Sequence, residues 1–461
     1  MSELTMDKLV SYCKRTGFVF PGSEIYGGMG NTWDYGPIGI ELKRNIKLLW
    51  WKKTVQESEN SFGIDTAILM NPMVWKASGH LDNFTDPLMD CRECKTRHRA
   101  DKLIEAYQRK ENKFDVNPDA LSKEELYNYI VEHKIKCPNC GKQNFTEVRN
   151  FNLMFETNRG VSEDKQSKIF LRPETAQGQY INFLNVQRAT RSKLPFGLAN
   201  IGKAFRNEIT PGNFTFRTIE FEQMEHQWFC KADEAMNYYE WYKNYAMEFF
   251  KFIGLNPENL RFKDHDKLAH YAKAACDVHY KFPFGWDEIN GTHLRGTWDL
   301  SRHTEFSGKT MEYTDPFTNE TYTPTVVEHT IGVDRLLLAI LCDAYEEQTL
   351  EDGDMRVVMH FSPKVAPYKV AVLPLQKNLS ESAKKVYRNL QSAFMCVYDE
   401  TGSIGKRYRR QDEIGTPFCI TYDFDSETDH KVTIRERDSM KQERIAIDDL
   451  VGYLHKKIYT D

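Results

Sequence analysis

The sequence has no long hydrophobic run. Its most apolar stretch, Leu336 to Cys342, is far shorter than the roughly 20 residues that a membrane-spanning helix needs. The first residues include Glu3 and Asp7 and contain no continuous apolar segment of the kind found in a signal peptide. We therefore expect neither a membrane helix nor a signal peptide, and we predict a cytoplasmic protein with no membrane partner.

The sequence also has little excess charge and no pattern of a disulfide framework. Its formal net charge of −5 over 461 residues neither indicates nor excludes a nucleic-acid partner, because such binding depends on local basic surface. Ten cysteines are scattered along the chain except for two close pairs, which favours reduced thiols. Hydrophobic residues make up 40% of the chain, enough for ordinary cores, and the length predicts about two to four domains.

Residues 40–55 have the spacing of an amphipathic helix, with apolar residues at 42, 46, 49 and 50. A Gly-rich, aromatic stretch precedes them and predicts a turn. The apolar side of this helix can pack on its own domain or contact a second subunit, and the sequence leaves both interpretations open.

Four cysteines form two Cys-x-x-Cys pairs near the ends of residues 91–144: Cys91, Cys94, Cys137 and Cys140. A gap of two residues lets both thiolates of a pair reach one tetrahedral ion at about 2.3 Å. Four protein ligands leave no position for water, so we predict a structural Zn²⁺ that helps to fold a small zinc-ribbon-like insertion. Four free thiols in a reducing compartment are the alternative.

Residues 197–229 predict a β-hairpin around a turn at Pro211-Gly212-Asn213. Arg206 and Glu208 stand two apart on the first strand and so share a face, while Arg217 and Phe221 follow the turn. One face can then hold an arginine for a phosphate, a carboxylate for an amine and a ring for stacking, which indicates a nucleotide site. The structural alternative is cross-strand ion pairing on a solvated hairpin.

A further arginine lies in Gly332-Val333-Asp334-Arg335, which opens a long apolar run. A strand end, a glycine turn and a buried helix would direct this guanidinium at an anion near the helix N-terminus. Acidic residues gather on other segments: Glu174, Glu220, Glu222, Glu225 and Glu288. Acids that face a triphosphate favour Mg²⁺ or recognition of a substrate ammonium.

Two more helices are predicted over 232–253 and 264–280, within a helical insertion of about 231–284. Beyond residue 362 the pattern alternates between strands and helices, which predicts a compact α/β domain. The expected elements are a strand at 368–373, a helix at 378–394, a strand at 395–399, a helix from about Lys406, strands at 417–423 and 431–436, and a last helix from Ile447.

The early helix, the hairpin Phe205-Arg206-Asn207-Glu208 and the segment Gly332 to Arg335 resemble the three motifs of class II aminoacyl-tRNA synthetases. A closer likeness, which includes Ser23-Glu24-Ile25-Tyr26-Gly27-Gly28 and Leu171-Arg172-Pro173-Glu174-Thr175, extends along nearly the whole chain to the dimeric glycyl-tRNA synthetase family. The resemblance implies an α+β fold with an antiparallel catalytic sheet flanked by helices. The implied domains are a catalytic domain at 1–90 and 145–361, the insertion at 91–144 and an α/β anticodon-binding domain at 362–461.

The resemblance implies a homodimer that ligates glycine to tRNA(Gly) with ATP and Mg²⁺, through glycyl-adenylate. The implied ATP-binding residues are Arg206, Asn207, Glu208, Arg217, Phe221, Glu288, Glu328 and Arg335, of which Arg206, Glu288 and Arg335 are the expected catalytic residues. The implied glycine-binding residues are Glu174, Glu225, Arg295, Glu328 and Thr330. Thr330 keeps a hydroxyl where the family usually has serine.

The C-terminal domain would then read the tRNA anticodon. Its expected RNA contacts are basic residues, four around Tyr408 and two on one strand face: Lys406, Arg407, Arg409, Arg410, Arg435 and Arg437. Basic residues beside an aromatic ring suit phosphate contacts and base stacking. A solvated helix face explains the cluster around Tyr408 nearly as well.

Two other functions are compatible with parts of this pattern. One is a related class II synthetase for threonine, proline or histidine; the setting of Glu174 and Glu225, and the lack of a metal-held substrate site in the sequence, favour glycine instead. The other is a catalytically inactive RNA-binding paralogue. Such a paralogue would lack Arg206, Glu208 or Arg335, and all three are present.

Overall fold

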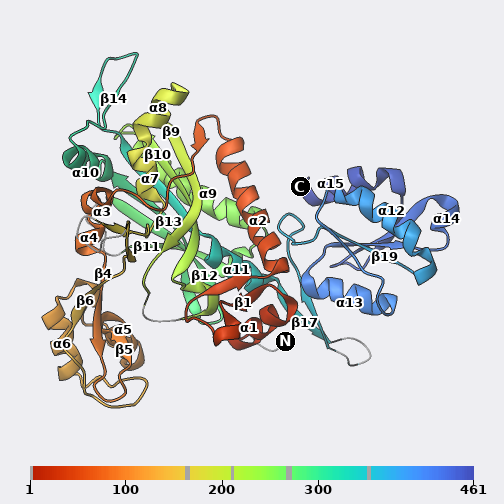
Figure 1. Ribbon diagram of the computed structural model, residues 1–461, viewed down its shortest axis with the longest axis horizontal. Coiled ribbons are helices and arrows are strands. Elements are labelled where there is room, and N and C mark those ends of the chain that lie inside the picture. Colours follow the sequence, from red (N-terminus) through yellow and green to blue (C-terminus); the bar gives the residue numbers. More distant parts are fainter. Residues whose placement is uncertain are drawn as a thin grey trace.

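The computed structural model describes residues 4–160, 167–208, 212–265, 272–349, 353 and 355–460. A seven-stranded sheet with its helices forms the largest body, a small unit with a three-stranded sheet lies at one end, and a domain with a five-stranded sheet lies at the other (Figure 1). Within the described residues, no helix combines the length and the hydrophobicity that crossing a membrane requires.

The seven-stranded sheet has the order β11-β12-β13-β16-β10-β9-β3, and its pairs are antiparallel except for β3 with β9. The strands are β3 (Ser61–Gly63), β9 (Phe196–Phe205), β10 (Glu220–Cys230), β11 (Leu260–Asp264), β12 (Ala274–Phe282), β13 (Gly285–Gly296) and β16 (Thr325–Gly332). The predicted hairpin is confirmed as β9 and β10; Pro211 of its turn lies outside the described residues.

Side chains of β10 alternate between the two faces of this sheet, as the pleat requires. His226 points to the face covered by α9 (Ala235–Phe252), where its Nδ1 lies 2.7 Å from the Tyr242 hydroxyl. The helices α2 (Pro37–Trp51) and α11 (Val333–Ala344) share a core with α9 on that face, through apolar residues such as Leu42, Phe249 and Leu337. On the opposite face, Phe196, Leu198 and Phe229 pack with α7 (Ala176–Ile181), α8 (Phe183–Thr190) and α10 (Trp298–Ser307), and the rest of that face carries polar side chains.

The predicted amphipathic helix is confirmed as α2, which starts with Pro37 and continues into a π-helical turn at Lys52–Gln56. The other elements of the main body are α1 (Met6–Thr16), β1 (Val19–Pro21), β2 (Trp33–Tyr35), α3 (Pro72–Ala77) and α4 (His80–Asn83). Three ribbons complete it: β7 (Glu156–Asn158) with β8 (Lys168–Phe170), β14 (Tyr313–Thr314) with β15 (Thr321–Tyr322), and β17 (Tyr345–Thr349) with β18 (Met355–Met359).

The helix predicted over 264–280 is wrong, because most of its described residues form β12, between β11 and β13 in the sheet. Cys276, Val278 and Tyr280 are buried on the α9 side, while Asp277 faces the opposite side, a period of two that the sequence reading took for a helix. Residues 266–271 of that prediction lie outside the described residues. Of the two helices expected within the insertion of about 231–284, the first is confirmed as α9.

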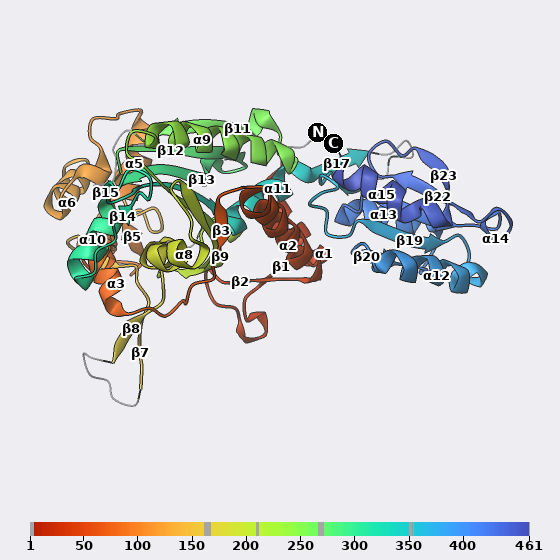
Figure 2. The same ribbon diagram turned by 90° about the horizontal axis from the view of Figure 1, so that it is seen from above.

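The small unit comprises β4 (Thr85–Asp90), β5 (Arg97–Arg99), α5 (Ala100–Glu111), α6 (Lys123–Glu132) and β6 (Arg149–Asn152). Its sheet has the order β5-β4-β6, and Ile104, Leu126 and Ile130 belong to a core of its own. The N-terminus of α6 has a capping box in which Ser122 and Glu125 satisfy each other's backbone N–H groups. Figure 2 shows this unit and the C-terminal domain at opposite ends of the main body.

The C-terminal domain contains β19 (Val370–Pro374), α12 (Ser380–Gln391), β20 (Cys396–Tyr398), α13 (Ile404–Ile414), β21 (Phe418–Tyr422), α14 (Ser426–Asp429), β22 (Lys431–Glu436), β23 (Gln442–Ala446) and α15 (Leu450–Tyr459). Its sheet has the order β20-β19-β21-β22-β23, with a separate core that includes Val372, Leu390 and Leu454. Every element predicted after residue 362 is confirmed. The edge strand β23 was missed because three of its five residues are exposed and its apolar alternation is weak.

Candidate active site

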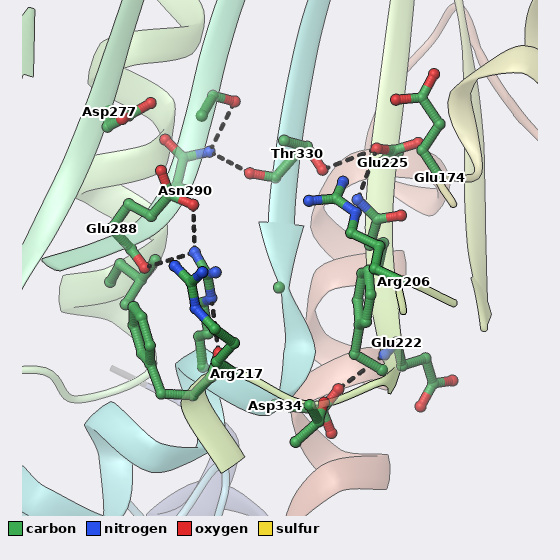
Figure 3. Close-up of a pocket in the computed structure, with 18 of the residues that line it drawn as sticks. Glu174, Arg206, Arg217, Glu222, Glu225, Asp277, Glu288, Asn290, Thr330 and Asp334 are labelled. Atoms are coloured by element: carbon green, nitrogen blue, oxygen red, sulfur yellow. Dashed lines mark hydrogen bonds and ion pairs between the residues drawn. The ribbon is translucent and has the colours of Figure 1, made fainter. Parts of the chain in front are cut away.

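A cavity of about 310 Å³ lies on the polar face of the large sheet, opposite α9. Residues of β10, β12, β13 and β16 form its floor, and the segments before α7 and after β9 close it (Figure 3). The cavity brings together these predicted site residues: Glu174, Arg206, Glu208, Arg217, Phe221, Glu225, Glu288, Arg295, Glu328, Thr330 and Arg335. Asn207 is not among the lining residues; its backbone N–H donates to Leu153 O at 2.9 Å.

Arg206 follows β9 rather than lying on it, which corrects the prediction that Arg206 and Glu208 stand on one strand. The strand ends at Phe205, and the Glu208 N–H turns back to Arg206 O at 2.7 Å. Arg206 Nε donates to Pro173 O at 3.1 Å, and the guanidinium carbon lies 5.3 Å and 5.2 Å from the ring centres of Phe84 and Phe221. This anchoring at Nε directs the end of the guanidinium toward the cavity.

Arg335 lies in the first turn of α11, at another side of the same cavity. Its Nε donates to Phe216 O at 3.0 Å, and its guanidinium stacks 4.2 Å from the Phe216 ring centre. The terminal nitrogen forms an ion pair with Glu288. The predicted convergence of Arg206 and Arg335 on one cavity is therefore present.

Asp334 fixes the N-terminus of α11 against α2. Its carboxylate accepts hydrogen bonds from Lys43 Nζ at 2.7 Å, from the Glu222 backbone N–H at 2.7 Å and from the Tyr35 hydroxyl. Burial alone would raise the pKa of Asp334, but Lys43 and these hydrogen bonds hold it below its usual range. Sequence reasoning missed Lys43, because its partner lies 291 residues away along the chain.

Three carboxylates, those of Glu174, Glu225 and Glu328, converge at one end of the cavity. Burial raises the pKa of Glu225 to about 8, and the charges of Glu328 and Glu174 add to this rise. The Glu225 carboxyl accepts hydrogen bonds from Thr175 Oγ1 at 2.5 Å and from Thr330 Oγ1 at 3.1 Å. This end of the cavity therefore suits a cation.

Glu174 and Glu328 remain ionised despite their burial. Burial would raise the pKa of Glu174, but His80, 3.5 Å away, and Arg295 hold it well below its usual range. Arg295 and His293 likewise outweigh burial and lower the pKa of Glu328 to about 2. Arg295 itself forms two hydrogen bonds with Asp299, at 2.7 Å and 2.9 Å, and lies 3.3 Å from Glu328. Arg295 thus holds the acidic end together from behind, a role that the sequence did not indicate.

The four cysteines of the two Cys-x-x-Cys pairs form one cluster beside β4, as their spacing predicted. Their sulfur atoms all lie within 4.8 Å of one another, with 3.6 Å from Cys91 to Cys140 and 3.7 Å from Cys94 to Cys137. Four thiolates bound to one tetrahedral ion at about 2.3 Å would lie roughly 3.8 Å apart. The cluster can therefore hold a metal ion with little movement.

The predicted RNA contacts of Arg407, Arg435 and Arg437 are wrong as direct contacts, because all three side chains are buried. Arg407 donates to Pro374 O and Gly402 O, Arg435 to Asp412, and Arg437 to Gly415 O and Phe361 O. These guanidinium groups satisfy backbone carbonyls and a buried acid, so they hold the domain together. Arg410 pairs with Asp399 at 2.5 Å, whereas Lys406 and Arg409 are exposed on α13.

Comparisons with known proteins identify the class to which this fold and cavity belong. A family model described as the class II tRNA synthetase core domain (G, H, P, S and T) matches residues 125–344, and one described as an anticodon binding domain matches residues 369–457. A crystal structure titled as the RNA binding domain of threonyl-tRNA synthetase from Cryptosporidium parvum covers 97% of this chain and 98% of its own, with a TM-score of 0.65 at 16% identity. The fold is that of a class II aminoacyl-tRNA synthetase.

Relatives of high identity narrow this class. The glycine–tRNA ligase of Clostridium acetobutylicum is 58% identical to this chain over 99% of both chains, and that of Caldanaerobacter subterraneus matches equally well. The glycine–tRNA ligase of Geobacillus thermodenitrificans is 56% identical over 98% of both chains. The chain belongs to the glycine–tRNA ligase family, as the sequence motifs indicated.

Proposed function

We propose that this protein ligates glycine to tRNA(Gly) in two steps, first forming glycyl-adenylate from glycine and ATP and then transferring glycine to the 3′ end of the tRNA. The observation that carries the proposal is that Arg206 and Arg335, from separate segments, line one cavity with an acidic end. Class II synthetases use ATP and Mg²⁺, which fits both features.

Formation of the adenylate requires cations rather than a nucleophilic side chain. Attack of the glycine carboxylate on the α-phosphorus concentrates negative charge on a pentavalent centre, which positioned guanidinium groups stabilise. Arg206 would hold the α-phosphate and the attacking carboxylate, and Arg335 would hold the γ-phosphate. Both guanidiniums are oriented through Nε and against an aromatic ring before any ligand binds.

Glu288 is the best placed carboxylate for Mg²⁺. It pairs with Arg335, and its side chain is 48% exposed. Its carboxylate can therefore reorient to coordinate an ion together with phosphate oxygens. Bound there, Mg²⁺ would neutralise phosphate charge. Glu328 fits this role less well, because Gln227, His293 and Arg295 already occupy its oxygens.

Adenine would bind beside Glu208 and Phe221. The Glu208 carboxylate can accept from the exocyclic amine, and Arg217 lies 3.5 Å from it. The Phe221 ring offers a face for stacking at the cavity wall.

Glycine would bind at the acidic end, with its ammonium among Glu174, Glu225 and Thr330. Selection of glycine is a problem of exclusion, because every competing amino acid is larger and must clash with a pocket built for a hydrogen at Cα. No separate editing step is then needed.

ATP–pyrophosphate exchange with each amino acid supplied separately tests this assignment. We expect exchange with glycine and none with threonine, proline or histidine. Exchange with one of those three instead would reassign the substrate. Absence of exchange with every amino acid would favour the inactive RNA-binding paralogue.

We propose that residues 362–461 act as the anticodon-binding domain, while residues 1–90 and 145–361 form the catalytic domain. Lys406 and Arg409, exposed on α13, are the best placed of the predicted basic residues to meet tRNA phosphates. Arg410 can join them if its ion pair with Asp399 opens.

We propose that Cys91, Cys94, Cys137 and Cys140 bind a structural Zn²⁺ in the insertion at 91–144. The insertion's small core, of which Cys91 and Cys137 are part, supports this role, because a bound metal would add folding free energy to it. Hydrogen bonds from Asn139 and Thr96 lower the pKa of Cys94 to about 5, which favours the thiolate that a metal binds.

We also propose a homodimer that works in the cytoplasm. On α2, the side chains of Ile40 and Leu48, two helical turns apart, are 39% and 62% exposed. On the segment between β1 and β2, Ile25 and Tyr26 are 88% and 86% exposed. Such a group of apolar side chains suits contact with a second copy. All ten cysteines are free thiols, which suits a reducing compartment.

A further inference from the structure

A second set of metal-ligating side chains lies on the cavity wall. His265 follows β11, Asp277 lies on β12 and His293 on β13, and the sheet brings one ligand atom of each within 4.8 Å of the others. All three line the cavity. Figure 3 shows Asp277 across the cavity from Glu174 and Glu225, while His293 contacts the acidic end through Glu328. The proposed reaction uses none of these three side chains.

His293 is oriented as a metal-bound histidine would be. Its Nδ1 lies 2.8 Å from Glu328 Oε1, which leaves Nε2 as the ring nitrogen for a metal ion. His293 Nε2 and Asp277 Oδ1 both lie beside Gly291. A carboxylate that accepts from one ring nitrogen while the other binds the ion is the usual arrangement around protein metals.

His265 Nε2 and Asp277 Oδ2 form a hydrogen bond of 2.8 Å beside His293. The rings of His265 and His293 meet edge to face, with centres 5.8 Å apart, so they do not fill the space by stacking. Gly291, opposite Asp277 on β13, leaves this space open: a Cβ there would lie 3.3 Å from His293 Nε2 and 3.4 Å from Asp277 Oδ1.

We propose that His265, Asp277 and His293 bind one divalent transition-metal ion, with Zn²⁺ as the ion that the donors fit best. Two imidazole nitrogens and one carboxylate are a set that leaves a fourth position for water or a substrate oxygen, and here that position faces the cavity. Mg²⁺ and Ca²⁺ prefer oxygen donors throughout. Donor atoms around a tetrahedral ion at about 2.1 Å lie roughly 3.4 Å apart. His265 Nε2 and Asp277 Oδ2, now 2.8 Å apart, would separate slightly, and the His293 donor already lies within 4.8 Å of both.

The motifs of the sequence did not indicate this set. Its members come from three segments without a recognised spacing motif, His265 and Asp277 being 12 residues apart. Bound metal would tie the end of β11 to the two strands that form the cavity wall.

Metal content of the purified full-length protein tests the proposal. We expect the wild type to hold one more Zn²⁺ per chain, after dialysis against micromolar free Zn²⁺, than the double variant His265→Gln/His293→Gln. The control His455→Ala removes an exposed histidine on α15 and should keep the wild-type content. Equal zinc content in the wild type and the double variant would overturn the site.

Two measurements on the wild type guard against a variant that fails to fold. Anomalous scattering at the zinc edge should give a peak between His265, Asp277 and His293, separate from any peak at the cysteines. Co²⁺ substitution should give absorption bands of a nitrogen and oxygen site beside the thiolate bands of the cysteine cluster. A peak at the cysteines alone, or zinc bound only at millimolar concentration, would contradict the proposal. Glycine-dependent pyrophosphate exchange by the same preparation reports on the proposed function independently.

Discussion

Arginines serve opposite purposes in the two main parts of the molecule. In the cavity, Arg206 and Arg335 are held through Nε and an aromatic ring, and their terminal nitrogens lie at the edge of an open space. In the C-terminal domain, Arg407, Arg435 and Arg437 are buried and bound to backbone carbonyls or to Asp412. The first pair borders an open cavity, where we propose that phosphate binds and where Arg335 also pairs with Glu288. The second group has its partners within the domain.

The difference follows from what surrounds each guanidinium. A buried cation without partners costs several kcal/mol, so buried arginines must satisfy their five donors within the fold. A guanidinium at a cavity can leave donors to solvent and later exchange water for phosphate. Substitutions should therefore affect stability in one region and catalysis in the other.

The largest effect is expected for Arg435→Ala, on stability. Arg435 donates to both oxygens of Asp412, at 2.9 Å and 3.0 Å, and Asp412 is 1% exposed. Removal of one partner of a buried pair costs about 3–5 kcal/mol, and we expect the low end because Arg356 still lies 2.9 Å from Asp412. Urea unfolding monitored by fluorescence measures the loss. Lys406→Ala, at an exposed position, should change the free energy of unfolding by less than about 0.5 kcal/mol, and equal effects would break the comparison.

The next effect is expected for Arg206→Ala, on catalysis. Loss of a charge-assisted contact of about 1.5–3 kcal/mol should slow glycine-dependent pyrophosphate exchange by roughly one to two powers of ten. The melting temperature should change little, because the side chain makes one backbone hydrogen bond at the cavity edge. Arg206→Lys keeps the positive charge but cannot donate two parallel hydrogen bonds as a guanidinium does, and it should recover part of the rate. An unchanged exchange rate in Arg206→Ala would remove Arg206 from the mechanism.

A pH-dependent effect is expected at the acidic end of the cavity. Burial and two neighbouring carboxylates raise the folded-state pKa of Glu225 to about 8, above the unfolded value near 4.5, so its contribution to stability is complete below about pH 4.5 and is lost as the pH rises to about 8. An ammonium binds the ionised form, so the KM for glycine should fall as the pH rises from about 6 toward 8, by up to roughly tenfold per unit. Glu225→Gln should flatten this dependence. A KM that rises with pH in the wild type would contradict the assignment.

The smallest effect is expected on the exposed basic residues of α13. Lys406→Ala combined with Arg409→Ala should raise the KM for tRNA several-fold and make its salt dependence shallower, by about one to two in the logarithmic slope. Aminoacylation measured at several salt concentrations gives both quantities. If the double variant charges tRNA with the KM and salt slope of the wild type, α13 does not meet RNA phosphates.

The sequence predicted elements and motifs well where the signal was local. Alternation over 197–229, the spacing of apolar residues in α2 and the two Cys-x-x-Cys pairs were each confirmed as structure, because each reports on neighbours along the chain. The same reasoning failed for β12, where buried residues on the two faces of a central strand resembled a helical run.

Partners distant in sequence carried no such signal. Lys43 with Asp334, and His265 and Asp277 with His293, meet through sheet pairing and helix packing alone. The burial of Arg407, Arg435 and Arg437 could not be predicted either, because the same basic residues can lie on a surface or inside a domain.

The amino-acid sequence by itself determined the class of fold, the family and the residue types that can grip a nucleotide, because motifs encode local backbone geometry and chemistry. Tertiary structure decided which charged groups face an open cavity and which are neutralised inside the protein. Burial and pairing depend on segments that meet only when the chain is folded, and they fix whether a guanidinium binds a substrate or supports the fold.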